Sequence, residues 1–324
     1  MRRIVGSAFG PPESYLLADA PAPIPAAVEV RIRVGAVALG YVDGLIIHGR
    51  YQNRPALPYV PGGEIAGTVD AVGDAVTSLR VGDRVVTWQL GGGLADWTVV
   101  NAADVDLLEL EMPLPVAAAM LVDFQTAHYA LFERGRVTAG DTVLVLGASG
   151  SVASAAIQLA AQAGAHVIAA ASTEAKRNAA IGMGARSAVD YSRSDWRDAL
   201  KAQAPQGTVS VVFDPVGGDA FEPAFRSLGK EGRHLVVGFA AGRVASLPAN
   251  LALLKSAELV GVDLRHFLAS QPDRARQVRR ALYSSVADGR LKAPSLVRFN
   301  LGEGQAALKA TMARDRVGKI VVVP

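Results

Sequence analysis

The feature that most constrains this chain is a long segment without charged side chains. Residues 142–173 contain no Asp, Glu, Lys or Arg. A segment of this length could span a lipid bilayer as a helix, but a spanning helix is more uniformly apolar. Here glycines and serines interrupt the first half, and Gln158, Gln162 and His166 interrupt the second. This pattern is more typical of a buried strand, a helix with one face on a sheet, and a second buried strand.

The flanking sequence continues this alternation of apolar strands and helices. We expect strands at residues 142–148, 166–172, 187–191, 209–216, 233–239 and 258–262. We expect connecting helices at residues 151–163, 174–181 and 195–203. Six apolar strands with helical connections predict an α/β fold with a parallel, doubly wound sheet.

The rest of the chain has a different pattern. Residues 28–37 alternate apolar and polar side chains, and residues 65–72 and 84–87 look similar, which predicts short strands in a separate domain. Residues 39–63 are rich in Gly, Pro and Tyr, so we expect a loop region rather than a regular element. After a helix at 272–287 we expect irregular segments and a final strand, KIVVVP, that returns to this first domain.

Composition excludes several classes of protein. The chain has 324 residues, enough for two domains, and no cysteine, which excludes disulfides, a thiolate nucleophile and thiolate metal ligands. The formal charge is only +3, and the arginines at 274, 276, 279 and 280 fit a solvated helix face better than a nucleic-acid site. Prolines at 11 and 12 precede any apolar region of signal-peptide length. We therefore expect a soluble, cytoplasmic protein that binds neither membrane nor nucleic acid.

A glycine-rich turn follows the first expected strand of the second domain. In GASGSVA, Ala148, Gly150 and Ala153 fall in the three small positions of the dinucleotide fingerprint G-x-G-x-x-G/A. Small residues permit the tight turn, the approach of backbone to a pyrophosphate, and close packing of helix on strand. The start of the helix offers unpaired amides and the positive end of its dipole to phosphates. The alternative is close packing alone, but the strand-to-helix context favours a nucleotide site.

The end of the next strand indicates which nucleotide. An NAD site usually has Asp or Glu there, to bind the ribose 2′-hydroxyl. This chain instead has Ser172, with Lys176 just beyond, and Tyr191 ends the following strand. A hydroxyl and an ammonium group suit a 2′-phosphate, so we predict NADPH rather than NADH. The alternative for Lys176 is an exposed helix lysine.

Several segments of the chain, taken in the order in which they occur, resemble the zinc-free quinone oxidoreductase branch of the medium-chain dehydrogenase/reductase superfamily. The similar segments are YVDGLIIHGRYQNRPALPYVPGGEIAGTVDAVG (41–73), VGDRV (81–85), QTAHYAL (125–131), GASGSVASAAIQLA (147–160), FDPVGGDAF (213–221), GRHLVVGFAAG (232–242) and LPANLALLKSAELVGV (247–262). The resemblance implies a GroES-like, partly β-barrel catalytic domain at 1–117 and 265–324 and a Rossmann domain at 118–264. It also implies a cofactor cleft between the two domains, and a homodimer.

The resemblance also implies individual site residues. With those already named, the expected cofactor contacts are Thr126, Gly147, Ala148, Ser149, Gly150, Ser151, Val152, Ser172, Lys176, Tyr191, Val216, Gly238, Phe239, Ala240 and Arg314. Tyr41, Tyr51 and Phe267 are expected to line the substrate pocket, although ordinary core packing is an alternative for the last two. Tyr41 is also the candidate catalytic residue.

Zinc-dependent relatives use cysteine and histidine ligands that this chain lacks. Gly63 stands where those relatives have histidine, and the five histidines, at 48, 128, 166, 234 and 266, show no close ligand spacing. We therefore expect no metal. The chain also departs from the family pattern at Gly40, usually asparagine, in the turn at Ser151 and Ala153, and at 263–266, where a WG-like segment is replaced. The changes at 40 and 263–266 leave the substrate open.

Three functions remain open from the sequence. The favoured one is zinc-independent reduction of quinones by NADPH, because without a Lewis acid the acceptor must already be electrophilic. The second is reduction of the C=C bond of enones or enoyl thioesters. The third is an NADPH-binding sensor or structural protein with little turnover.

Overall fold

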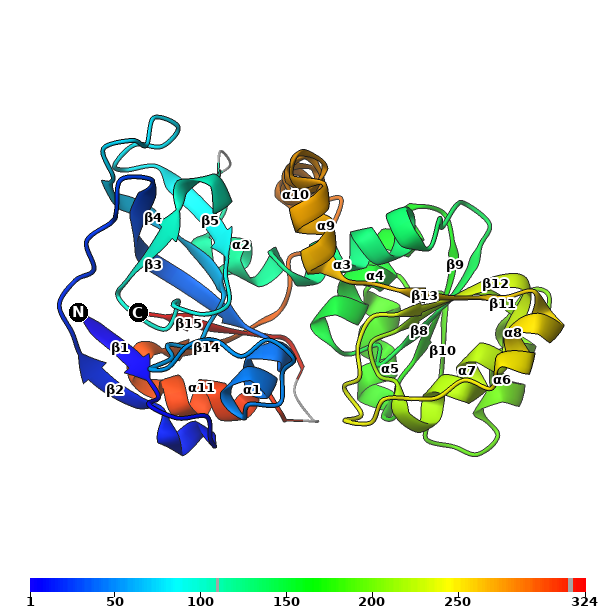
Figure 1. Ribbon diagram of the computed structural model, residues 1–324. Helices are drawn as coiled ribbons and strands as arrows, with labels where there is room; N and C mark the ends of the chain where they lie inside the picture. Colours follow the sequence, from blue (N-terminus) through cyan, green and yellow to red (C-terminus); the bar gives the residue numbers. More distant parts are fainter. Residues whose placement is uncertain (109–110, 314–316) are drawn as a thin grey trace. The chain divides into compact units, whose positions relative to one another are not determined.

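The computed structural model describes residues 1–108, 111–313 and 317–324, which form two compact units. The first unit comprises Met1–Val122, Tyr283–Asp288 and Ala293–Pro324, and the second Asp123–Leu282 and Gly289–Lys292. Each unit has its own sheet (Figure 1).

The second unit contains a six-stranded, wholly parallel sheet. Its strands are β8 (Thr142–Leu146), β9 (His166–Ala170), β10 (Ser187–Val189), β11 (Val209–Asp214), β12 (Leu228–Val236) and β13 (Glu258–Gly261). They lie in the order β10-β9-β8-β11-β12-β13, so the strand order reverses direction between β8 and β11. This confirms the predicted doubly wound sheet, whose ligands characteristically bind beyond the carboxyl ends of the strands at the reversal.

Helices connect these strands and cover the sheet. They are α3 (Asp123–His128), which continues into a π-helical turn at Tyr129–Arg134, α4 (Ser151–Gln162), α5 (Glu174–Gly182), α6 (Trp196–Gln203), α7 (Phe221–Arg226), α8 (Ala249–Lys255), α9 (Leu264–Ser270) and α10 (Pro272–Ala287). Leu144 and Ile168 point into a core shared with α6, α7 and α8, and alternation sends their neighbours to the other face.

The uncharged segment at 142–173 forms β8, α4 and β9. All five residues of β8 are buried, as expected for a central parallel strand. In the described part of the chain, no helix combines the length and the hydropathy that crossing a bilayer requires.

The first unit contains a mainly antiparallel sheet. Its strands are β3 (Glu29–Leu39), β4 (Glu64–Val72), β5 (Arg84–Trp88), β6 (Trp97–Asn101), β7 (Val105–Leu107), β14 (Leu296–Asn300) and β15 (Lys319–Val323), with β1 (Arg2–Val5) and β2 (Leu16–Asp19) paired separately. The order is β14-β15-β3-β4-β5-β7, and β6 also pairs with β3. Its helices are α1 (Tyr41–Ile47), α2 (Leu114–Met120) and α11 (Gly304–Ala310). Short 3₁₀ turns in the chain are Pro12–Ser14, Ala102–Asp104, Gly218–Ala220 and Leu301–Glu303.

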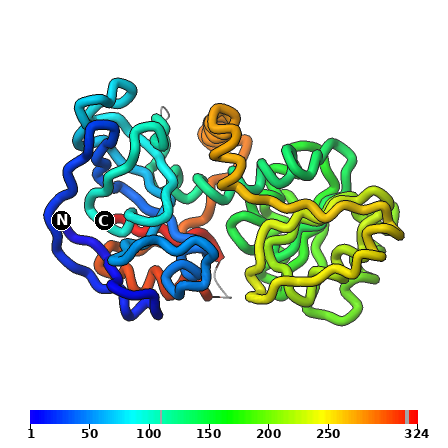
Figure 2. The backbone as a smooth tube through the Cα atoms, in the orientation of Figure 1, coloured from blue at the N-terminus to red at the C-terminus, as the bar shows by residue number. Residues whose placement is uncertain are grey.

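Two expectations for irregular structure were wrong. Residues 39–63 contain helix α1, which begins after Gly40, whose amide donates to the Asp43 carboxylate at 2.7 Å. The tail contains β14 and α11 as well as the expected last strand. That strand, β15, pairs with β3 and so returns to the first sheet, as predicted (Figure 2).

Residues 265–282 belong with the second unit, whereas the sequence boundary had assigned them to the first domain. Phe267 of α9 stacks on Tyr129 with ring centroids 4.5 Å apart. The Gln125 side chain donates to the Ala275 carbonyl, and Arg274 pairs with Glu133. These contacts attach α9 and most of α10 to the start of the second unit.

Candidate functional site

The glycine-rich turn joins β8 to α4 at the carboxyl edge of the parallel sheet. Gly147 has φ +60°, and a Cβ there would lie 2.7 Å from Cγ2 of Val216. The amide of Ala148 donates to the Ala170 carbonyl at 3.1 Å, which holds the turn against the end of β9. Glycine is therefore required at 147 both by conformation and by space.

The backbone amides in the first turn of helix α4 have no acceptor within the helix. Gly150 is the N-cap and offers no side chain, so the first-turn amides, beginning at Ser151 and Val152, have no capping acceptor from it. Ser151 Oγ is buried and makes no hydrogen bond within the described residues. A buried hydroxyl without an acceptor, beside unpaired amides, fits the oxygen of a bound phosphate. The turn at 147–152 therefore fits the pyrophosphate of a dinucleotide.

The end of β9 carries hydroxyls and a lysine. Ser172 is exposed, and Thr173 caps α5 by accepting the amide of Lys176 at 3.4 Å. Arg177 is committed elsewhere: it pairs with Asp190 at 3.0 Å and donates to the Ala171 carbonyl. By residue type alone, the hydroxyl of Ser172 and the ammonium group of Lys176 suit a 2′-phosphate.

Tyr191 lies just after β10. Its side chain is partly buried and packs against the hydrophobic core of the second unit. Burial raises the pKa of its phenol, and the negative charges of Asp214 and Asp190 raise it further. The hydroxyl therefore remains a donor at neutral pH, as a contact to a phosphate requires.

The loop after β11 lies against the turn at 147–152, and the loop after β12 lies against the loop after β11. Val216 follows β11, and its side chain occupies the space beside Gly147. Gly238, Phe239 and Ala240 follow β12; the amide of Gly238 donates to Asp214 O, and that of Ala240 to Pro215 O at 3.1 Å. Phe239 is 38% exposed, a high value for a phenylalanine, and is available to a planar ligand.

Three more residues were expected to contact the cofactor or the substrate. Thr126 is on α3, also in the second unit. Phe267 is fully buried against Tyr129, so the structure places it in the core rather than on an open pocket. Arg314 lies outside the described residues.

The candidate substrate residues belong to the first unit. Tyr41 is the first residue of α1 and half-buried, and Tyr51 packs against the first unit's core.

Near the start of α1 is a buried pair of charged side chains, Glu64 and Lys319, that the sequence did not predict. Lys319 Nζ lies 2.6 Å from Glu64 Oε1, and burial raises the pKa of Asp43 nearby.

Gly40 belongs to this same region. A Cβ at position 40 would lie 3.6 Å from Lys319 Nζ and 3.7 Å from Glu64 Oε1, so a longer polar side chain there would meet the buried pair. The departure from asparagine at 40 therefore leaves the Glu64–Lys319 pair without a side-chain neighbour at that position.

The surroundings of Gly63 do not fit a zinc ligand. A Cβ on Gly63 would lie 2.1 Å from the carbonyl oxygen of Gln89, so a histidine there would require the backbone to move. The chain has no cysteine, and in the ranges that the structure describes no three His, Asp or Glu side chains gather as a metal site. Histidine at position 63, the ligand that the zinc-dependent relatives use there, therefore does not fit this backbone.

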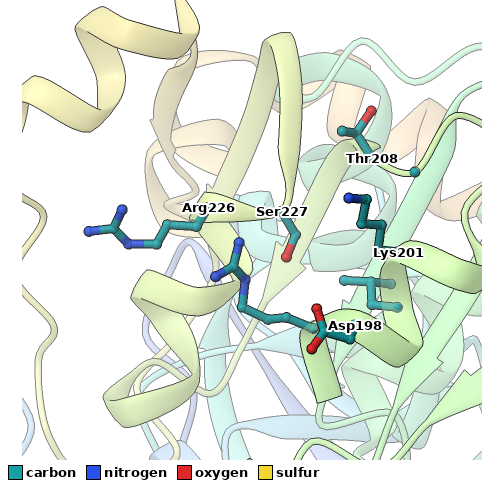
Figure 3. A pocket seen from close by; sticks show the side chains of 8 residues that line it. Asp198, Lys201, Thr208, Arg226 and Ser227 are labelled. Carbon is teal, nitrogen blue, oxygen red and sulfur yellow. The ribbon is translucent and has the colours of Figure 1, made fainter. Parts of the chain in front are cut away.

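A pocket of about 290 Å³ lies elsewhere in the second unit (Figure 3). Lys201 and Asp198 of α6 line it, with Thr208 just before β11 and Ser227 just before β12. These positions are at the amino ends of the parallel strands, opposite the phosphate-binding turn. The pocket is therefore not the dinucleotide site.

Comparison with known proteins agrees with this geometry. The family model of the alcohol dehydrogenase GroES-like domain matches residues 26–109, and that of the zinc-binding dehydrogenase matches residues 151–281. Quinone oxidoreductase-like protein 2 of Bos taurus is 36% identical over 296 residues, which cover 91% of this chain and 84% of the relative. The chain belongs to the quinone oxidoreductase-like group of the medium-chain dehydrogenase/reductase superfamily.

Solved structures of this superfamily match the whole fold. Escherichia coli quinone oxidoreductase, solved in complex with NADPH, has a TM-score of 0.93 and 26% identity, with 100% of both chains covered. The CurK enoyl reductase has a TM-score of 0.88 and 25% identity, covering 99% of this chain and 98% of its own. This medium-chain dehydrogenase/reductase is thus similar to reductases of two substrate types.

Local sequence motifs predicted three parts of the cofactor site of this medium-chain reductase. The turn at Gly147, the β9 end at Ser172 and the loop at Phe239 all lie at the carboxyl edge of one sheet. Local motifs did not predict the side-chain pairs that distant segments bring together, namely Glu64 with Lys319 and Asp214 with His234. Only the polar residue types at otherwise apolar strand positions signalled them.

Proposed function

We propose that this protein is an NADPH-dependent oxidoreductase that reduces quinones by hydride transfer. The observation that carries the proposal is the sheet edge at β8 and β9, where an uncapped helix start and Gly147 lie beside Ser172 and Lys176, with no carboxylate at the end of β9. The name of the Bos taurus relative and the NADPH complex of the Escherichia coli enzyme support both the cofactor and the acceptor class.

The residues divide the binding of the cofactor among them. Amides at the start of α4 and the Ser151 hydroxyl bind the pyrophosphate, while Ser172, Lys176 and Tyr191 bind the adenosine 2′-phosphate. Thr126, the loop at Val216 and the segment at 238–240 position the nicotinamide, and we retain Arg314 as a candidate for the adenosine end. When bound, NADPH supplies the hydride; the protein contributes positioning and exclusion of water.

We propose that the reaction proceeds without a metal. The backbone crowding at Gly63 and the absence of cysteine support this. The acceptor must then be electrophilic already, as a quinone is. The quinone takes up the hydride, and one proton from solvent or from Tyr41 completes the hydroquinone. Tyr41→Phe separates these proton sources: a fall in kcat of tenfold or more assigns the proton to Tyr41, and an unchanged kcat assigns it to solvent.

The direct test is whether the purified protein accelerates the oxidation of NADPH by 1,4-benzoquinone or 9,10-phenanthrenequinone, followed by the loss of NADPH absorbance. We expect turnover that is faster with NADPH than with NADH and that survives extensive treatment with a chelator. No acceleration with any quinone would refute the proposal. Loss of activity on chelation, restored by zinc, would refute its metal-free part.

A second candidate is reduction of the C=C bond of enones or enoyl thioesters, which the similarity to the CurK enoyl reductase favours. This reaction needs an acid that protonates the carbon next to the carbonyl. Product analysis with an enone panel distinguishes the two, because only the second reaction gives a saturated ketone or thioester. Tight NADPH binding without turnover on either panel would indicate a sensor or structural protein.

We further propose a homodimer and a cytoplasmic location. Strand β13 ends the second unit's sheet, and Leu259 on it is 48% exposed; Leu253 and Leu254 of the preceding helix α8 are also exposed. An unpaired edge with apolar side chains favours pairing with a second copy. Light scattering tests the dimer, with Leu259→Glu expected to give monomers, and fractionation of the native cells tests the location.

A further inference from the structure

A buried pair of hydrogen-bonded side chains lies behind the loops of the candidate cofactor site. Asp214 is the last residue of β11 and 1% exposed, and His234 lies on the neighbouring strand β12 and is fully buried. The Nε2 of His234 lies 3.0 Å from Asp214 Oδ2. A buried histidine that contacts a buried carboxylate fixes the orientation of both groups.

The other oxygen of Asp214 holds the loop that follows β11. Oδ1 accepts the amides of Val216 and Gly217, both at 2.8 Å. Gly217 and Gly218 have φ values of +64° and +59°, so the loop makes a tight left-handed turn at this point. One carboxylate therefore connects strand β12, through His234, to the backbone of the 215–218 loop.

That loop contacts both neighbouring parts of the cofactor site. The Val216 side chain fills the space beside Gly147 in the phosphate-binding turn. The carbonyls of Pro215 and Val216 accept the amides of Ala240 and Ala241 at 3.1 and 2.9 Å. A shift of the 215–218 loop would therefore move the segment that carries Phe239.

The surroundings of His234 leave it a single hydrogen-bonding role. Its ring lies 4.5 Å from that of Phe221 and 5.9 Å from that of Phe225, measured between centroids. Its Nδ1 has no hydrogen-bond partner in the described ranges. The imidazole thus acts through Nε2 on Asp214 alone, and being fully buried it does not contact a ligand.

We propose that Asp214 and His234 form a latch that positions the nicotinamide half of the cofactor through the 215–218 loop and the 238–241 segment. His234 is then a positioning residue for hydride transfer. The role of His234 in hydride transfer rests on the proposed function. Its effect on the positions of the 215–218 loop and the 238–241 segment does not. Small displacements of reacting groups are costly, since a shift of about 1 Å can slow a reaction roughly 100-fold.

The test compares His234→Phe with His234→Gln. Phenylalanine keeps a ring between Phe221 and Phe225 but removes the donor, whereas glutamine places an amide N–H near the position of Nε2. His166→Phe, at the amino end of β9, is the matched control. Three quantities are measured: single-turnover hydride transfer to 1,4-benzoquinone, Kd for NADPH, and Kd for 2′,5′-ADP, which contains only the adenosine half.

For His234→Phe we expect hydride transfer to slow at least tenfold and the Kd for NADPH to rise several-fold, with the Kd for 2′,5′-ADP within twofold of wild type. His234→Gln should recover most of the rate, and His166→Phe should change none of these quantities. Unchanged hydride transfer in His234→Phe would overturn the proposal. So would an equal loss of affinity for NADPH and 2′,5′-ADP, which indicates a general loss of structure.

Hydrogen–deuterium exchange without ligand separates this proposal from the proposed function. In His234→Phe the amides of Val216, Gly217, Ala240 and Ala241 should exchange at least tenfold faster, while those of β8 stay protected. Unchanged exchange at these four amides overturns the latch whatever the enzyme's activity. If wild type binds neither NADPH nor 2′,5′-ADP, the proposed function fails, and faster exchange at the four amides still supports the latch as a control of the loops.

Discussion

Replacement of Lys176 by alanine should reduce the preference for NADPH over NADH. Lys176 lies in the first turn of α5, which Thr173 caps, and its side chain is only partly buried. A hydrogen bond to a charged group contributes about 1.5–3 kcal/mol when well formed, and partial exposure favours the lower half of that range. Since 1.4 kcal/mol corresponds to tenfold, a loss of about 1.5–2 kcal/mol lowers kcat/KM for NADPH roughly 10- to 30-fold.

The assay measures kcat/KM for NADPH and for NADH with one quinone, for wild type and for Lys176→Ala. NADH lacks the 2′-phosphate, so its kcat/KM should stay within about twofold. The matched control is Lys201→Ala, which removes an exposed lysine at the amino edge of the same sheet and should alter neither value. Added salt should weaken NADPH binding to wild type more than to the variant, because salt screens exposed charges.

Two results would refute this reasoning. If Lys176→Ala leaves kcat/KM for NADPH unchanged, the lysine does not bind the 2′-phosphate. If kcat/KM falls equally for NADPH and NADH, Lys176 supports the fold of α5 or another part of the cofactor, and the basis for NADPH selectivity lies elsewhere.

Three further predictions follow from local geometry. Gly147→Ala places a methyl group in the occupied space beside it and in a left-handed conformation that costs about 1–2 kcal/mol, so calorimetry should show at least tenfold weaker NADPH binding with an unchanged circular dichroism spectrum. Lys319→Met removes the ammonium group that lies 2.6 Å from the buried Glu64 carboxylate and should cost about 3–5 kcal/mol, seen as a lower Tm that the added Glu64→Gln change partly restores. The hydrogen bond from the Ser192 hydroxyl, helped by Arg177, lowers the pKa of Asp190, so this carboxylate stabilises the fold above its unfolded pKa of about 3.9. The Tm deficit of Asp190→Asn should therefore be present at pH 7 and shrink as the pH falls below about 4; a deficit independent of pH would contradict this assignment.

The second unit was predictable from sequence because its signals are local. Apolar strands, helices of ordinary length and a glycine-rich turn occur in order, and α10 has the bounds that its sequence predicts. Helix α1 was missed because its seven residues include Gly44, which disfavours a helix. The structure explains that glycine: a Cβ would lie 2.6 Å from Met312 Sδ and from Thr311 Oγ1, atoms distant in sequence.

The candidate site also contains some residues that local motifs predict and others that only the tertiary structure brings together. Residues on the turn after β8 and at the end of β9 follow from motif spacing, because parallel strands bring their carboxyl ends to one edge. The pairs Asp214–His234 and Glu64–Lys319 depend on register between strands, and no short window of sequence reports it. Phe267 shows the converse, since its side chain type suits a pocket but its packing on Tyr129 is decided by tertiary contacts.

The position of β15 has a consequence for the order of synthesis and folding. This strand lies between β14 and β3, in the interior of the first sheet, although it follows all the other described strands along the chain. All of the second unit, by contrast, has been synthesised once residue 292 has emerged. Domains generally fold as units during translation. Until residues 319–323 are made, the 37–39 part of β3 lacks its β15 partner, so the second unit can complete its fold first.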